Sequence, residues 1–161
     1  MPLSLFSSPL YSGLFADEEL VTLLDDSSDV AHMIAFERAL AVAQGRLGVI
    51  PQNAAQEIAA KLETPTVDPA SLKAGTLSAG VPVPALVAAL RKIAGAEAGQ
   101  WLHWGATSQD VMDTAQVLQT RACLDHLGPR LSRVIDALKT QSDLCSEQLL
   151  AGRTRSQIST P

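Results

Sequence analysis

The sequence contains few aromatic residues: three Phe, two Trp and one Tyr, together 4% of its 161 positions. Sheet proteins rely on aromatic and β-branched residues, whereas Ala and Leu, which are abundant here, favour helices. The scarcity of aromatic residues therefore argues against a sheet-based fold and predicts an all-α chain. The length suits one domain, or one domain with a piece of another.

Cysteine is also scarce, since Cys123 and Cys145 are the only two and form neither a C-x-x-C pair nor a Cys/His metal set. We therefore expect no metal site and a reducing, cytoplasmic location. The net charge of −5 and the lack of a basic patch argue against nucleic acid as a partner. No apolar run reaches about 18 residues, so no membrane partner is expected. Residues 1–10 lack the basic start and apolar core of a secretory signal.

Residues 26–51 have the spacing of an amphipathic helix. An acidic N-cap signal lies at residues 26–29, and Gly48 with Pro51 predicts where the helix ends. The apolar positions between these signals recur every three or four residues: Met33, Phe36, Leu40, Ala43 and Leu47. This recurrence is typical of the buried face of a helix.

The next stretch alternates between helix signals and breakers. Asn53 and the pair Asp68-Pro69 each predict the start of a helix. Another helix is expected at residues 85–94, between Gly- and Pro-containing loops at residues 77–84 and 95–105. This part of the chain therefore reads as a small helical domain.

The last helical segment is long, with a helical pattern from Asp110 almost to Leu150. Its apolar stripe has helical spacing: Leu124, Leu127, Leu131, Val134, Leu138 and Cys145. Gly128-Pro129 predicts a kink or short break, because proline removes one hydrogen bond and clashes with the preceding turn. The predicted organisation is an N-terminal helical domain at residues 1–110. Residues 111–161 then hold the first long helix of a central bundle and the start of the next loop.

The stretch H-W-G-A-T-S-Q-D-V-M-D-T-A at residues 103–115 runs from a glycine-containing loop into a helix start. Thr107 and Asp110 have the spacing of a capping box, in which the Thr107 hydroxyl accepts a first-turn N–H and Asp110 reaches back to the Thr107 N–H. Ser108 is left with a free hydroxyl where the helix N-terminus favours an anion such as a carboxylate. The alternative is a purely structural cap, because capping boxes are common.

The whole pattern H-x-G-A-T-S-x-D-x-x-D-T-A resembles the second signature segment of the fumarase/aspartase superfamily, whose enzymes cleave or form C–O or C–N bonds beside a carboxylate. Further segments resemble the superfamily in the same order: residues 11–19, 36–51, 79–87 and 151–161. The resemblance implies that Thr107 and Ser108 hold a substrate carboxylate. It also implies that His103 helps to bind the substrate.

Three departures point to one branch of the superfamily. Leu10-Tyr11 carries no cation where adenylosuccinate lyases have an Arg-Tyr pair for a nucleotide phosphate. Residues 77–84 contain no histidine, and Thr154-Arg155 stands where those lyases have Thr-His. These features resemble bacterial cycloisomerases that close a tricarboxylic diene to a lactone in aromatic catabolism. The resemblance implies a small tricarboxylate substrate, no cofactor and a homo-oligomer, a tetramer in the full-length protein.

Two alternatives stay open. One is a lyase of the same superfamily that acts on a succinyl-type adduct, such as adenylosuccinate lyase. The other belongs to a different class: a catalytically silent helical fragment that associates through its long helix. Superfamily enzymes carry the catalytic serine on a G-S-S-x-M-P-x-K-x-N loop, and no such string occurs here. We therefore assign no catalytic residue to this chain and expect the 161 residues alone to be inactive.

Arg155 and Gln157 lie in the segment that resembles the superfamily's G-R-T-H-x-Q-x-x-P motif. Arg155 is permanently cationic and a poor general base, so it cannot replace a catalytic histidine. We expect it to clamp an additional substrate carboxylate through two parallel hydrogen bonds, with a solvated loop arginine as the alternative. Gln157 is expected to bind substrate, with a loop-capping role as its alternative.

Replacing Arg155 with Lys tests this expectation in the complete protein that contains the chain. Lysine keeps the charge but loses the planar fork, so the KM for the tricarboxylate should rise more than kcat falls. Steady-state kinetics measure both constants. Unchanged kinetics in Arg155→Ala would assign the residue to the solvated loop instead.

Overall fold

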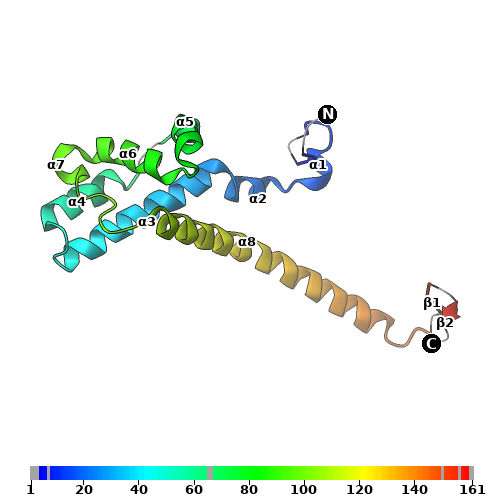
Figure 1. Cartoon of the computed structure of the whole chain (residues 1–161). Coiled ribbons are helices and arrows are strands. Elements are labelled where there is room, and N and C mark those ends of the chain that lie inside the picture. The colour runs from blue at the N-terminus through cyan, green and yellow to red at the C-terminus, as the bar shows by residue number, and fades with distance from the viewer. Residues whose placement is uncertain (1–3, 7, 65–66, 150, 156, 160–161) are drawn as a thin grey trace. The chain divides into compact units, whose positions relative to one another are not determined.

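The computed structural model describes residues 4–6, 8–64, 67–149, 151–155 and 157–159. Helices dominate this described part, which confirms the predicted all-α class (Figure 1). In chain order the elements are α1 (Ser12–Phe15), α2 (Glu18–Leu23), α3 (Asp26–Arg46), α4 (Gln52–Lys61), α5 (Pro69–Ala79), α6 (Val83–Ala94), α7 (Ala96–Gly99), α8 (Ser108–Cys145), β1 (Gly152–Arg153) and β2 (Ile158–Ser159). The chain divides into two compact units, Met1–Cys123 and Leu124–Pro161, and α8 contributes to both. The domain boundary predicted at residue 110 remains a prediction.

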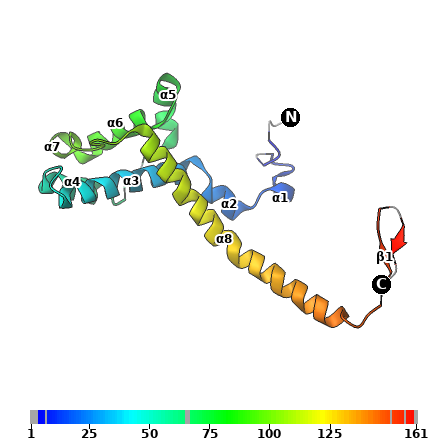
Figure 2. The same cartoon turned by 60° about the horizontal axis from the view of Figure 1, so that its bottom comes forward.

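The core of the first unit lies where α6 packs against α4, α5 and α7, while α3 packs along α4. Figure 2 shows α6 and α7 running beside α3 and α4. Ile58 on α4 is 0% exposed, as are Leu86 and Leu90 on α6. Each such side chain contributes about 1.5–3 kcal/mol relative to its exposed state, so this contact fixes α6 against α4.

Small residues let these helices approach one another closely. A Cβ atom on Gly45 of α3 would overlap the Cβ of Ala55 on α4. A Cβ atom on Gly75 of α5 would lie 2.5 Å from the Cβ of Ala85 on α6. Because protein interiors are close-packed, a larger residue at either glycine would push the paired helices apart.

The buried face of α3 differs from the predicted one. Met33 is 2% exposed as expected, but Leu47 is 79% exposed. The buried residues of α3 are Val30, Met33, Ile34, Glu37, Ala41 and Gly45. Gly45 faces α4 because only glycine fits against Ala55, and this orientation turns Leu47 outward. As a consequence, Glu37 lies on the buried face.

The two predicted loops are shorter than expected. A brief turn joins α5 to α6 where Gly80 adopts a left-handed φ of 77°. Pro84 falls in the first turn of α6, where a missing N–H costs nothing, so this proline does not mark a loop. α7 lies inside the predicted loop at residues 95–105. The predicted cap at Asp68 is confirmed, since its carboxylate accepts a hydrogen bond from the Ala70 N–H at 3.0 Å.

The second unit contains the C-terminal part of α8. The predicted break is wrong, because α8 continues through Pro129, and the kink given as its alternative stays a prediction. Gly128 precedes this proline and has no Cβ to clash with its ring, which makes the helical conformation accessible. Leu124, Leu131 and Leu138 of the predicted stripe are 63%, 62% and 63% exposed.

None of the described helices is long and apolar enough to cross a membrane.

A short antiparallel hairpin of β1 and β2, which the sequence pattern did not predict, follows α8. Gly152 pairs with Ser159, and Arg153 pairs with Ile158. Some residues of the predicted motif lie outside the described residues: Ser156, Thr160 and Pro161.

Candidate functional site

Asp110 holds the start of α8. Its Oδ2 atom accepts a hydrogen bond from the Thr107 backbone N–H at 2.8 Å and another from the Thr107 hydroxyl at 3.1 Å. The predicted contact of Asp110 with the Thr107 N–H is confirmed. The predicted role of the hydroxyl is wrong, because it donates to Asp110 instead of accepting a helix N–H. A hydrogen bond to an ionised carboxylate is stronger than a neutral one, and both bonds hold the pKa of Asp110 below its usual range.

Ser108 lies half-buried in a groove of about 290 Å³ in the first unit. The groove is lined by Val83, Pro84, Val87, Ala88, Arg91, His103 and Ser108. Its polar members converge from α6, from the following loop and from the first residue of α8. Within the described part of the chain, the Ser108 hydroxyl has no hydrogen-bond partner, so it is available to a ligand. The structure therefore brings His103 and Ser108 together, while Thr107 does not line the groove.

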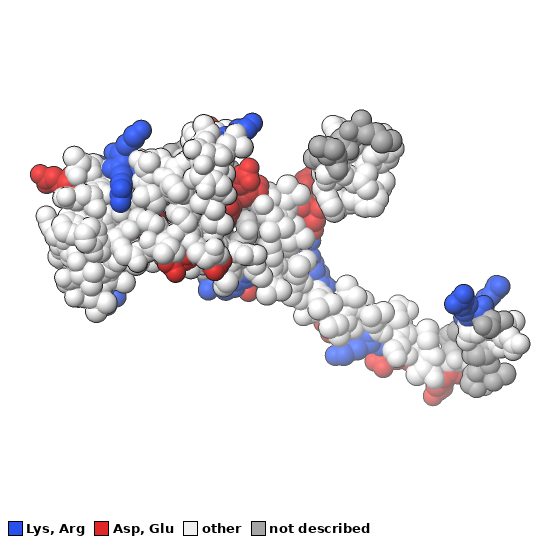
Figure 3. Space-filling view, viewed as in Figure 1, with Lys and Arg blue, Asp and Glu red and all other residues white. Residues whose placement is uncertain are grey.

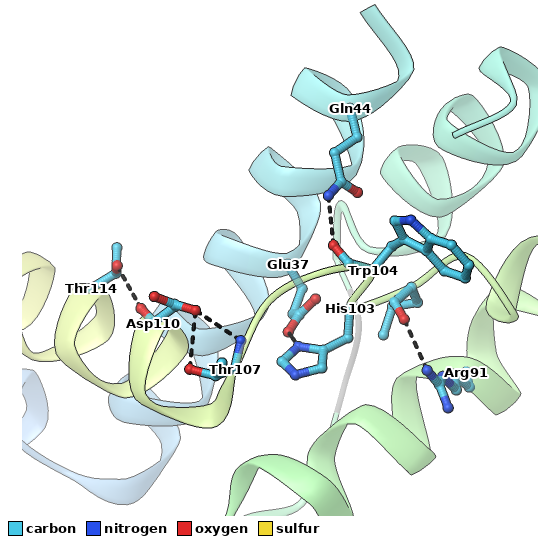
Figure 4. Close-up of polar contacts among 9 residues, drawn as sticks. Glu37, Gln44, Arg91, His103, Trp104, Thr107, Asp110 and Thr114 are labelled. Carbon is cyan, nitrogen blue, oxygen red and sulfur yellow. Dashed lines mark hydrogen bonds and ion pairs between the residues drawn. The ribbon is translucent and has the colours of Figure 1, made fainter. Parts of the chain in front are cut away.

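His103 has an unusual backbone conformation, with a φ of 63° that few residues other than glycine adopt. Side chains hold the carbonyl groups on both sides of it. Arg91 donates through Nη2 to the Leu102 carbonyl at 3.1 Å, and Gln44 donates through Nε2 to the Trp104 carbonyl at 2.6 Å (Figure 4). The loop conformation is thus imposed by α3 and α6.

Glu37 contacts the His103 ring directly. Its side chain is 1% exposed, and its Oε1 atom lies 2.5 Å from Nδ1 of His103. Burial raises the pKa of Glu37, although the hydrogen bond to His103 and the charge of Arg91 act against this rise. Figure 4 shows the carboxylate reaching from α3 to the ring.

Sequence reasoning did not identify Glu37 or Arg91 as part of the site. Glu37 lies one helical turn from Met33 and one from Ala41, both of which are buried. An ionisable residue between two buried positions of one helix face is the signal that points to a site. The predicted stripe shares Met33 and Phe36 with the core but leaves out the buried Ile34 and Ala41 on either side of Glu37, and so concealed this signal.

Arg155 and Gln157 belong to the second unit, and both side chains are exposed. The Gln157 carbonyl accepts hydrogen bonds from the Thr154 hydroxyl at 2.6 Å and from the Thr154 N–H at 2.9 Å. These bonds close the turn between β1 and β2. Substrate binding by Arg155 and Gln157 remains a prediction.

The groove is suited to an anion. It is lined by Arg91, His103 and Ser108 and lies at the N-terminus of α8, where the helix dipole is positive. On the face shown in Figure 3, Lys and Arg side chains are scattered among large uncharged areas. A larger cavity of about 530 Å³ is lined by Asp26, Asp29 and Lys73 among mostly apolar residues and contains no predicted site residue. The smaller groove is therefore the better candidate for binding a carboxylate.

Comparison with known proteins places the chain in a family. A family model described as a lyase matches residues 8–161. The chain therefore belongs to this lyase family of the fumarase/aspartase superfamily.

Individual relatives carry different activities. The 3-carboxy-cis,cis-muconate cycloisomerase of Acinetobacter baylyi is 36% identical over 159 residues, which cover 96% of this chain and 35% of that protein. The adenylosuccinate lyase of Methanothermobacter thermautotrophicus is 31% identical over 147 residues, which cover 91% of this chain and 33% of that protein. The crystal structure of 3-carboxy-cis,cis-muconate lactonizing enzyme from Pseudomonas putida matches with a TM-score of 0.87 and 34% identity, over 96% of this chain and 36% of that one. The chain thus spans about a third of the length of the curated relatives it matches.

Proposed function

We propose that the protein containing this chain is a cytoplasmic cycloisomerase. It closes 3-carboxy-cis,cis-muconate to 4-carboxymuconolactone in protocatechuate catabolism, the β-ketoadipate pathway. The observation that carries the proposal is the convergence of Arg91, His103 and Ser108 on one groove at the start of α8. The similarity to cycloisomerases along nearly the whole chain supports the same assignment. In this proposal the chain supplies one side of the active site, the groove that binds substrate carboxylates.

The chemistry explains why hydrogen-bond donors are needed there. Lactonisation adds a carboxylate oxygen across a C=C bond, and a proton has to reach the α-carbon. Negative charge builds up on the carboxylate conjugated to that bond, so preorganised donors at this carboxylate lower the barrier. The Ser108 hydroxyl and the first-turn N–H groups of α8 are such donors. Arg91 holds another carboxylate of the substrate at the α6 side of the groove.

A lyase that acts on a succinyl-type adduct is the second candidate. The adenylosuccinate lyase relative supports it, and succinyl adducts also present carboxylates to such a groove. A nucleotide substrate additionally needs a cation for its phosphate, and Leu10-Tyr11 supplies none. This difference favours the tricarboxylate.

Substrate conversion by the complete protein tests the assignment. The protein should convert 3-carboxy-cis,cis-muconate, which is followed by the loss of ultraviolet absorbance of the conjugated diene. Adenylosuccinate and argininosuccinate should not be turned over, because the groove is assigned to a small tricarboxylate. Turnover of either compound at a rate equal to that of the muconate would refute the proposal.

Replacing Ser108 with Ala tests the donor role of its hydroxyl. The change should lower kcat of the complete protein by about 10²–10³, the usual loss for one donor to a developing oxyanion. Ser132→Ala is the matched control, because it removes a hydroxyl at an exposed position of α8, where the side chain donates to the Gly128 carbonyl of the same helix. Normal turnover in Ser108→Ala would leave this hydroxyl without a role in the reaction.

Copies of the chain associate through the exposed apolar face of α8. Leu124, Leu131 and Leu138 are more than half exposed, and large apolar patches are rare on monomers. Sedimentation equilibrium at tens of micromolar should therefore show an oligomer. The double change Leu131→Glu and Leu138→Glu should dissociate it, while Thr140→Glu, at an exposed position on the opposite face of the same helix, should not. A monomeric wild-type chain would contradict this proposal.

A further inference from the structure

The contact between Glu37 and His103 joins a buried carboxylate to a residue of the groove. Nδ1 of His103 lies 2.5 Å from Oε1 of Glu37, and the same ring lines the groove beside Ser108. The second carboxylate oxygen, Oε2, is buried without a hydrogen-bond partner in the described part of the chain. Carboxylates rarely occupy such a place in a helical core, because burying a charge costs free energy unless it is paired.

We propose that Glu37 is a positioning residue that fixes His103 with its proton on Nδ1, so that Nε2 is the nitrogen presented to a carboxylate ligand in the groove. The identity of that ligand rests on the proposed function. A carboxylate accepts hydrogen bonds but cannot donate, so it binds Nε2 only when that atom also carries a proton. The negative charge of Glu37 stabilises the doubly protonated ring that results. Ligand binding is thereby coupled to the uptake of a proton by His103.

The backbone around His103 supports a positioning role. The φ of 63° is sterically costly for a residue with a Cβ, and it persists because Arg91 and Gln44 hold the two flanking carbonyls. The loop that Arg91 and Gln44 hold therefore places the ring of His103 beside Glu37. Backbone strain of this kind gathers at functional sites, where the surrounding structure determines the conformation.

The groups around Glu37 act on its pKa in opposite directions. Arg91 on α6 and His103 on the loop both lower the pKa of Glu37, while burial, the larger effect, raises it. Asp110 at the start of α8 interacts electrostatically with His103. Since burial dominates, the ionised carboxylate costs folding free energy at pH values above its folded pKa. A group that costs stability and contacts a residue of the groove is better explained by function than by folding.

Histidine NMR tests the proposal without any substrate. The chain holds three histidines, His32, His103 and His126, so His103→Gln assigns the signals by their loss. At about pH 8.5, where a histidine ring is ordinarily neutral, long-range ¹H–¹⁵N spectra should show Nδ1 of His103 protonated. Glu37→Leu, which removes the acceptor, should shift the proton toward Nε2, and Glu37→Gln, which keeps an acceptor, should retain it on Nδ1. A wild-type ring protonated on Nε2 overturns the proposal, as does an unchanged tautomer in Glu37→Leu.

Steady-state kinetics of the complete protein are a second test of the positioning role of Glu37. Glu37→Gln removes the charge, so the KM for 3-carboxy-cis,cis-muconate should rise about tenfold, the effect of one weakened charge-assisted bond, with kcat changed less. Glu37→Leu should raise KM further. Glu63→Gln and Glu63→Leu are matched controls at an exposed glutamate and should leave both constants unchanged. Unchanged KM in both Glu37 variants overturns the proposal. Failure of the wild-type protein to convert the muconate refutes the proposed function instead, and the tautomer then decides the role of Glu37.

Thermal unfolding separates positioning from a structural role. Because burial raises the pKa of Glu37, its folded form binds a proton more tightly than its unfolded form, and stability is lost as pH rises through the folded pKa. Glu37→Gln should therefore raise the unfolding midpoint by a few degrees at neutral pH. This gain should disappear in acid, where the wild-type carboxyl is protonated. A lower midpoint at neutral pH would show that Glu37 serves the fold and would overturn the proposal.

Discussion

The groove depends on how the peptide around His103 is held. Arg91 from α6 and Gln44 from α3 bind the carbonyls on its two sides, and Glu37 binds its ring. A loop backbone with a positive φ has no regular partner for its carbonyls, so these side chains take the place of secondary structure. If they were absent, the ring of His103 would have no defined position.

The helices that carry these side chains are fixed by close packing. Gly45 sets the approach of α3 to α4, and the buried contact of Ile58 with the α6 side of the core fixes α6. Apolar burial of this kind supplies the free energy that offsets an ionisable group at Glu37. The same packing decides which face of α3 is buried, and so places Glu37 beside the loop.

The family assignment and the substrate assignment rest on different residues. The pattern at residues 103–115 is a feature of the superfamily, and relatives with different activities match this chain over most of its length. The proposed substrate rests in part on positions where the sequence departs from the lyase pattern, such as Leu10-Tyr11 and Arg155. These residues differ in charge from the lyase pattern, and charge decides whether a phosphate or a carboxylate is held.

The sequence by itself determined the helical class, the cap at Asp68 and the contact of Asp110 with Thr107, because periodicity and capping act within four residues along the chain. It could not determine which face of α3 is buried, since that depends on the fit of Gly45 against α4. It also could not place Glu37, which meets His103 across 66 residues, or Gln44, which meets Trp104 across 60. Contacts between residues so far apart have no local signature. Only the packing of α3, α4 and α6 brings them together, and so the tertiary structure decided the site.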